Sequence, residues 1–147
     1  MSELIDRLVN RLGPGKVFRL QAVESDVPER SQAPVPVYVT SAVSAQPTPW
    51  PRPVRLLDPP EPVLALAAMP DHPPKAFTWR KVQHRVVRAD GPERITGEWW
   101  IRSSELAAVR DYWIVENQEG RRFWLFRQGD GVDTTTGSLA WFLHGLF

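Results

Sequence analysis

The chain has 147 residues and no cysteine, with 18 lysines and arginines against 17 aspartates and glutamates. The lack of cysteine excludes disulfides and thiolate metal sites. The near-balance of charge excludes a global field that would draw the chain onto nucleic acid or an anionic membrane, so such binding would need a local patch. No apolar run approaches the roughly 20 residues of a membrane span, and the N-terminus has no secretory signal pattern. We therefore expect a soluble cytoplasmic protein with no membrane partner.

Residues 1–30 are expected to form a short helix and a strand. Apolar residues recur at helical spacing from Leu4 to Leu12, and Gly13 follows as a stop signal. Residues 16–23 alternate weakly, as a strand does. One short helix and one strand are too little for an independent core. We therefore expect this part to be the remnant of a larger domain.

Residues 31–76 are expected to be a proline-rich linker. Thirteen of the fifteen prolines lie between Pro28 and Pro74. Proline lacks the backbone donor and fixes φ, which excludes it from long helices and from inner places in a sheet. From Arg52 to Val63 proline alternates with apolar and charged residues, as in an extended or polyproline segment. This segment either lies along the domain that follows or is a disordered spacer.

Residues 77–147 have the pattern of short antiparallel strands. The runs 77–88 and 93–101 flank a turn signature at 89–92, and the runs 112–116 and 122–128 flank a hairpin loop in which Gly120 needs a positive φ. Residues 138–147 form a final strand or a short helix. We therefore predict a mainly β protein, with a small antiparallel sheet or partly closed barrel in its C-terminal half, preceded by the N-terminal helix and the extended linker.

Residues for catalysis or metal binding are lacking in the sequence. No serine lies in a nucleophile elbow, and the three histidines are far apart without helical ligand spacing. Gly13-Pro14-Gly15-Lys16 lacks the spacing of a phosphate loop, and residues 129–133 lack the ligands of a calcium loop. We therefore expect no enzyme, no cofactor and no metal site.

Aromatic residues and arginines are the chain's main candidates for binding. Six of the seven tryptophans lie in the last half of the chain, where they can serve a core, a partner interface or a base-stacking surface. The residues that we predict for a partner surface are Trp99, Trp100, Trp113, Arg127, Trp141, Phe142 and Phe147. The alternative is a single-stranded nucleic-acid surface made by Arg85, Arg121, Arg122 and Trp124. Ten basic against nine acidic residues between Trp79 and Phe147 favour ordinary ion pairing over the second hypothesis.

Several ordered motifs resemble the C-terminal region of the ImuB family, the Y-family-polymerase-like proteins of the bacterial mutagenesis cassette. In the C-terminal half these are GPERI (91–95), EWW (98–100), RDYW (110–113), GRRFWLFR (120–127) and WFLHGLF (141–147). Upstream they are RLG (11–13), VFRL (17–20), VES (23–25), PER (28–30) and RLLDPP (55–60). Together they extend over nearly the whole chain.

The resemblance implies a catalytically inactive adaptor in damage-induced translesion synthesis. It implies two partners, an ImuA-like RecA-related protein and an error-prone replicative-type DNA polymerase, contacted by the C-terminal region. The palm, fingers, thumb and most of the little finger of that family have no counterpart here, and no glutamine-led clamp motif is present. We therefore do not expect sliding-clamp or lesion-template binding, and we expect a fragment, a truncated product or a detached C-terminal module.

Overall fold

The computed structural model describes residues 2–39, 50–69, 72–133 and 135–147. The chain divides into two compact units, Met1–Thr48 and Pro49–Phe147. Of the helices in the described residues, none combines the length and the apolar content that a membrane-spanning segment requires. The predicted mainly β fold class is confirmed, because strands make up 50% of the chain and helices 14%.

The first unit contains a helix and a two-stranded sheet. Helix α1 (Ser2–Leu12) is followed by the 3-10 helix η1 (Pro14–Lys16), strand β1 (Phe18–Ala22), the 3-10 helix η2 (Pro28–Arg30) and strand β2 (Gln32–Pro36). Gly13 ends α1 as predicted, with φ of 91° and an N–H that donates to the carbonyl of Val9 at 2.8 Å. The β1 and β2 strands pair antiparallel, with Phe18 opposite Pro36 and Ala22 opposite Gln32.

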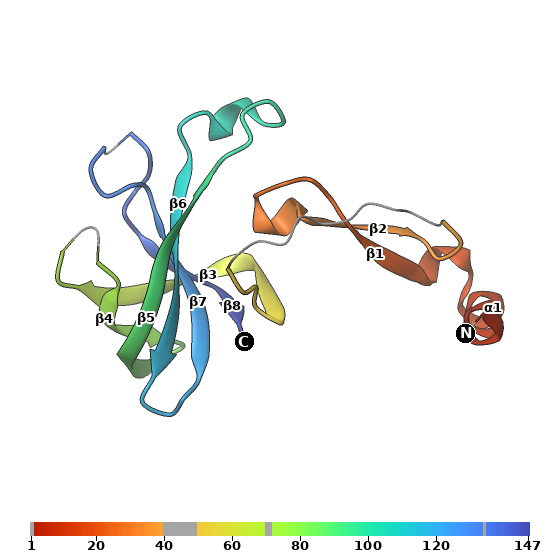
Figure 1. The fold of residues 1–147 in the computed structure, drawn as a ribbon, viewed down its shortest axis with the longest axis horizontal. Helices are drawn as coiled ribbons and strands as arrows, with labels where there is room; N and C mark the ends of the chain where they lie inside the picture. The colour runs from red at the N-terminus through yellow and green to blue at the C-terminus, as the bar shows by residue number, and fades with distance from the viewer. Residues whose placement is uncertain (1, 40–49, 70–71, 134) are drawn as a thin grey trace. The chain divides into compact units, whose positions relative to one another are not determined.

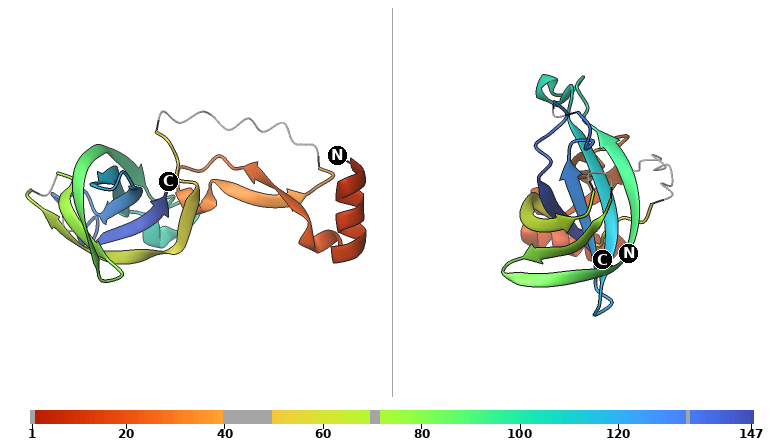
Figure 2. Two further views of the ribbon diagram at one scale, coloured as in Figure 1. Left: turned by 90° about the horizontal axis from the view of Figure 1, so that it is seen from below. Right: turned by 90° about the vertical axis from the view of Figure 1, so that its left-hand side faces the viewer.

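The second unit is a six-stranded antiparallel sheet that closes on itself, and we call it the barrel. Its strands are β3 (Arg55–Ala67), β4 (Pro74–Trp79), β5 (Val82–Thr96), β6 (Val109–Asn117), β7 (Arg122–Gln128) and β8 (Trp141–Leu146). Each strand pairs with the next along the chain, and β3 also pairs with β8, which completes the circuit. The left view of Figure 2 shows the strands curling around a common interior.

Strand β3 lies within the expected linker, which is a difference from the sequence prediction. Residues 32–36 of the same stretch form β2, whereas 40–49 and 70–71 lie outside the described residues. Two of the three prolines in β3 fit because its pairing with β8 skips from Leu56 to Glu61, which leaves Pro59 and Pro60 out of the ladder, whereas Pro62 stands opposite Phe142. An irregularity in the ladder removes the need for the missing N–H donors.

Strand β5 runs through the predicted turn at 89–92, so that prediction is wrong. The register with β6 shifts between Asp90 and Glu93, which makes this a bulge rather than a reversal. Gly91 has φ of 143°, and a Cβ at this position would come within 2.7 Å of the Tyr112 carbonyl oxygen. Glycine is therefore required for close backbone approach at a bulge, which the sequence pattern does not distinguish from a turn.

The actual reversal before β5 comes at Arg80 and Lys81, which have φ of 49° and 68°. The guanidinium of Arg80 donates to Glu61 at 2.6 Å and lies 4.7 Å from the centre of the Trp79 ring. These hydrogen bonds from Arg80, together with one from the Trp79 indole, hold the pKa of Glu61 below its usual range. Side-chain contacts therefore hold a turn that contains neither glycine nor asparagine.

Strands β6, β7 and β8 carry apolar side chains on both faces. The predicted hairpin loop before β7 is confirmed, with Gly120 at φ of 77°, and the closing segment is a strand rather than a helix. The interior cluster contains Trp113, Val115, Phe123, Leu125 and Leu143, whereas the alternate residues form a second cluster on the outer face. Most of the tryptophans in the last half of the chain are therefore buried or partly buried and hold the sheet together.

Candidate functional site

The exposed aromatic surface of the barrel is concentrated in the connection between β5 and β6, residues 97–108, which we call the tryptophan loop. In Figure 1 it extends beyond the ends of the two strands and contains the 3-10 helix η3 (Ser103–Glu105). Trp99 is 57% exposed, Trp100 67%, Ile101 56% and Leu106 73%. The two indole rings meet edge to face with centroids 6.0 Å apart. These four side chains form an apolar surface that the barrel does not bury.

Hydrogen bonds fix the backbone of the tryptophan loop. At its base the N–H of Gly97 donates to the carbonyl of Ala108 at 2.8 Å. The N–H groups of Ile101 and Arg102 both donate to the carbonyl of Glu98, at 2.9 and 3.0 Å, and the N–H of Glu98 donates to the Glu105 carboxylate at 3.0 Å. The exposed rings are therefore carried on an ordered turn.

Gly97 is the close-contact position in the tryptophan loop. A Cβ added there would come within 2.6 Å of both the Cβ and the carbonyl oxygen of Glu105. The two ends of the loop therefore approach too closely for any side chain at residue 97. The expected second strand run ends at Thr96, so Glu98, Trp99 and Trp100 turn away from the sheet instead of continuing it.

Of the residues predicted for a partner surface, Trp113, Arg127 and Trp141 lie in the barrel interior. Arg127 belongs to an ionic row with Arg94 and Asp111, which are directly opposed on β5, β6 and β7. Asp111 accepts hydrogen bonds from Arg94 at 2.7 and 2.9 Å and from Arg127 at 2.8 Å. The Arg127 guanidinium also lies 5.5 Å from the centre of the Trp113 ring. These side chains are structural, which corrects their predicted place on the surface.

Phe142 and Phe147 are half-buried members of the outer aromatic cluster. Phe142 stacks on Phe126 with ring centroids 5.1 Å apart, and Tyr112 stacks on Trp124 at 4.2 Å. The Tyr112 hydroxyl is 2.8 Å from Nδ1 of His144, which is fully buried. Sequence reasoning missed this hydrogen bond, since Tyr112 and His144 are far apart in the chain.

The alternative nucleic-acid residues do not form a stacking surface. Trp124 is only 1% exposed, so its ring cannot stack on a base. Arg85, Arg121 and Arg122 are exposed, but Arg121 lies over the Phe123 ring and Arg122 over the Phe147 ring, each 5.2 Å from the centroid. The structure therefore separates the basic residues from any exposed ring.

A metal site has no support in the described part of the chain, which contains no group of three or more metal-ligating side chains. His84 lies with Phe77 and Phe123 at the inner cluster, whereas His144 belongs to the outer one.

Ile101 and Leu106 are the residues of the tryptophan loop that the sequence prediction omitted. The signal for them was an apolar pair on either side of Ser103 and Ser104, in a segment without strand alternation.

Comparison with known proteins agrees with the motifs. The chain is 49% identical to Protein ImuB of Caulobacter vibrioides strain NA1000 / CB15N, in an alignment of 156 positions that covers all of this chain. Protein ImuB of strain ATCC 19089 / CIP 103742 / CB 15 matches with the same identity and coverage. The chain spans 33% of the length of these relatives and corresponds to their C-terminal third. No family model matches the chain, and no solved structure matches it.

Proposed function

We propose that this chain is a non-catalytic protein-docking module of an ImuB-like adaptor in DNA-damage-induced translesion synthesis, and that the tryptophan loop is its docking surface. The observation that carries the proposal is the pair of exposed indoles on a hydrogen-bonded loop. The similarity of the whole chain to the C-terminal region of ImuB supports a role in the mutagenesis cassette.

Physical arguments support a protein partner for this loop. Tryptophan is enriched among the residues that dominate binding energy, and it supplies a large contact area with few rotatable bonds. The backbone hydrogen bonds at Gly97, Ile101 and Arg102 already order the loop, so binding costs little further conformational entropy. Ile101 and Leu106 add aliphatic area beside the rings. An apolar groove on another protein matches this mixed aromatic and aliphatic surface.

We propose as partners the ImuA-like RecA-related protein and the error-prone replicative-type polymerase. The test is co-purification of each with the chain carrying Trp99→Ala and Trp100→Ala together. We expect at least one partner to bind about tenfold more weakly or worse, since a buried interface tryptophan contributes about 2 kcal/mol or more. Circular dichroism should show that the variant keeps its β fold, because both rings are exposed on the loop and do not pack in the barrel.

The matched control replaces two exposed apolar residues outside the tryptophan loop, Val54→Gln and Val132→Gln. This control should bind the affected partner as the unaltered chain does. Equal binding of both partners by the double tryptophan variant, with its fold retained, would contradict the proposal.

Single-stranded nucleic acid is the weaker candidate function, because Trp124 is buried, Arg121 lies over the buried Phe123 ring and Arg122 lies over the half-buried Phe147 ring. We expect a low-salt titration with oligothymidine to leave the tryptophan fluorescence unchanged. Quenching that is reversed by salt would instead support a nucleic-acid surface.

A further inference from the structure

A second exposed surface lies on the outer side of β3, β4 and β5, and we call it the leucine face. The strand register places Leu64, Thr78 and Gln83 in one row across the three strands, and Leu66, Ala76 and Arg85 in the next. Because side chains alternate along a strand, these six residues share one side of the sheet, opposite to the buried Val63 and Phe77.

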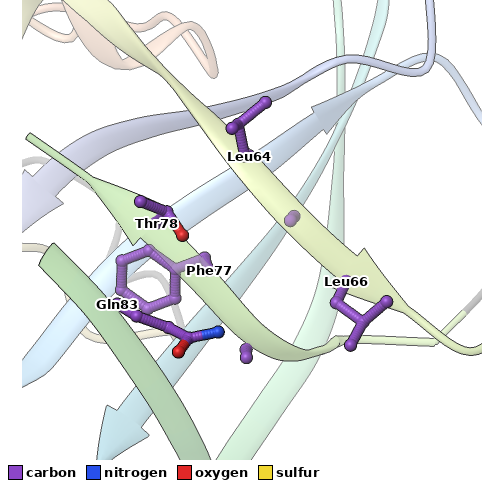
Figure 3. Close-up of a pocket in the computed structure, with 7 residues that line it drawn as sticks. Leu64, Leu66, Phe77, Thr78 and Gln83 are labelled. Atoms are coloured by element: carbon purple, nitrogen blue, oxygen red, sulfur yellow. The ribbon is translucent and has the colours of Figure 1, made fainter. Parts of the chain in front are cut away.

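The leucine face contains a hollow between two exposed leucines. Leu64 is 80% exposed and Leu66 66%, although both are paired with residues of β4. Figure 3 shows the two side chains along β3, with Thr78 and Gln83 beside them. The hollow has a volume of about 200 Å³, and small Ala76 lies at the position between Leu66 and Arg85. Aliphatic side chains around a hollow can accept a partner's side chain.

The strands of the leucine face lie in a basic stretch of the sequence, and Arg85 lies in the face itself. Between Val63 and Arg88 the sequence has five basic residues, and Asp71 is its only acidic residue. Arg80 is paired with Glu61, and Arg88 lies 3.5 Å from Asp90. In the described part of the chain no carboxylate pairs with Lys75, Lys81 or Arg85. The whole chain has a net charge of only +1, so this basic character is local.

We propose that the leucine face binds an acidic amphipathic segment of a partner protein, with aliphatic side chains in the hollow and a carboxylate beside Arg85. Leucines do not stack on bases, and the nearest rings are the buried Phe77 and the partly buried Trp79 beneath Arg80, so the surface suits a protein better than a single-stranded nucleic acid. Strand β4 is paired on both sides, so the segment binds across the face rather than adding a strand.

The leucine face is separate from the tryptophan loop. It lies at the start of β5, whereas the loop leaves the end of that strand after Thr96. The two surfaces therefore lie near opposite ends of the 15-residue strand β5. A module with both surfaces can hold two different protein segments at the same time, which goes beyond the proposed docking function of the loop.

The experiment measures fluorescence anisotropy of labelled probes with the full chain. One probe is a synthetic amphipathic helix with leucine on one side and glutamate on the other, and the second has lysine in place of every glutamate. We expect the glutamate peptide to bind more tightly. Leu64→Gln with Leu66→Gln should weaken it about tenfold, and Arg85→Glu should remove the preference between the peptides.

The matched control is Val54→Gln with Val132→Gln, since these residues are also highly exposed and lie outside the leucine face. The control and the double tryptophan variant should both bind the glutamate peptide normally, so failure here is distinguishable from failure of the tryptophan loop. Equal binding of the two peptides, or binding insensitive to the leucine substitutions, would overturn the proposal. Binding of oligothymidine that is lost only in the charge-reversed variant would assign the basic residues to nucleic acid instead.

Discussion

Asp111 is a buried carboxylate in the barrel that forms ion pairs with Arg94 and Arg127. Its side chain is 1% exposed and that of Arg127 is 3% exposed, whereas Arg94 reaches solvent. Two buried charges in contact stabilise each other, but a charge left alone after its partner is removed is strongly destabilising. The arginine therefore has a structural role in a region where sequence reasoning expected a contact surface.

Arg127→Ala should reduce the free energy of unfolding by about 3 kcal/mol, at the low end for breaking a buried pair, because Asp111 loses one cationic partner but keeps Arg94. Urea unfolding followed by circular dichroism measures this change. Arg88→Ala is the matched control, since that arginine and Asp90 are exposed, and its cost should be below about 1 kcal/mol. Similar midpoints for the two variants would contradict the structural role of Arg127.

His84 makes the stability of the barrel sensitive to mild acid. Burial, followed by the positive charge of Arg121, lowers the pKa of His84 below its ordinary value. Between that lowered pKa and the unfolded value of about 6.5, the unfolded chain binds a proton that the folded chain does not. Stability should therefore fall as the pH decreases below about 6.5, until the folded-state pKa is passed.

His84→Gln should flatten the stability profile in that pH range, because glutamine keeps a polar neighbour for Asn117, 3.2 Å from His84, but does not titrate. Chemical denaturation at a series of pH values measures the slope. His72→Gln, at an exposed position, should keep the slope of the unaltered chain. An unchanged slope in the His84 variant would show that other groups cause the acid sensitivity.

At the scale of single elements, the β4–β5 turn shows what the sequence can and cannot predict. The sequence pattern predicted one continuous run over residues 77–88, but the chain reverses inside it at Arg80 and Lys81. Both residues occupy left-handed conformations that usually need glycine or asparagine. The contacts of Arg80 with Glu61 and Trp79 depend on residues brought together by the fold, so local propensity could not reveal this turn. The bulge at Gly91 was misread for the same reason, because its close neighbour Tyr112 belongs to another strand.

Lys81→Gly should raise the free energy of unfolding by about 0.5–1 kcal/mol, since a non-glycine residue in this conformation costs roughly 1–2 kcal/mol and glycine loses part of that gain through its flexible unfolded state. Thermal unfolding measures the shift. The matched control is Lys75→Gly in strand β4, which should destabilise. A lower melting temperature for the Lys81 variant would mean that its side chain contributes more than its backbone strain costs.

At the scale of the whole molecule, the fold class and the N-terminal helix were predictable because both depend on short-range periodicity. Which tryptophans are exposed was not predictable. Glu98-Trp99-Trp100-Ile101 and Asp111-Tyr112-Trp113-Ile114 share one pattern, an acidic residue and two aromatic residues before isoleucine. The ending of β5 at Thr96 leaves Trp99 and Trp100 outside the sheet, whereas Trp113 lies within β6. Strand β3 was not predicted within the linker, because prolines argue locally against a strand. The skipped register with β8 that accommodates Pro59 and Pro60 depends on tertiary pairing, which the local pattern does not reveal.

The second unit should fold without the first, because it has its own interior cluster and a closed circuit of strand pairs. We expect a fragment of residues 49–147 to unfold cooperatively and to keep the near-ultraviolet circular dichroism of its buried tryptophans. The fragment 1–48 is the comparison, and it should lack a cooperative transition because its core is small. A non-cooperative transition in the longer fragment would show that the barrel needs the first unit.

The ionic row of Arg94, Asp111 and Arg127 has a consequence for how the barrel strands find their alignment. In most strands a one-residue slip is unfavourable, because it turns polar side chains toward the core. Strands β6, β7 and β8 are apolar on both faces, so hydrophobicity alone discriminates poorly between their possible registers. A slip of β7 by one residue would place Arg127 opposite Arg110 or Tyr112 and leave Asp111 without it. Charge pairing across three strands therefore makes the native alignment unique.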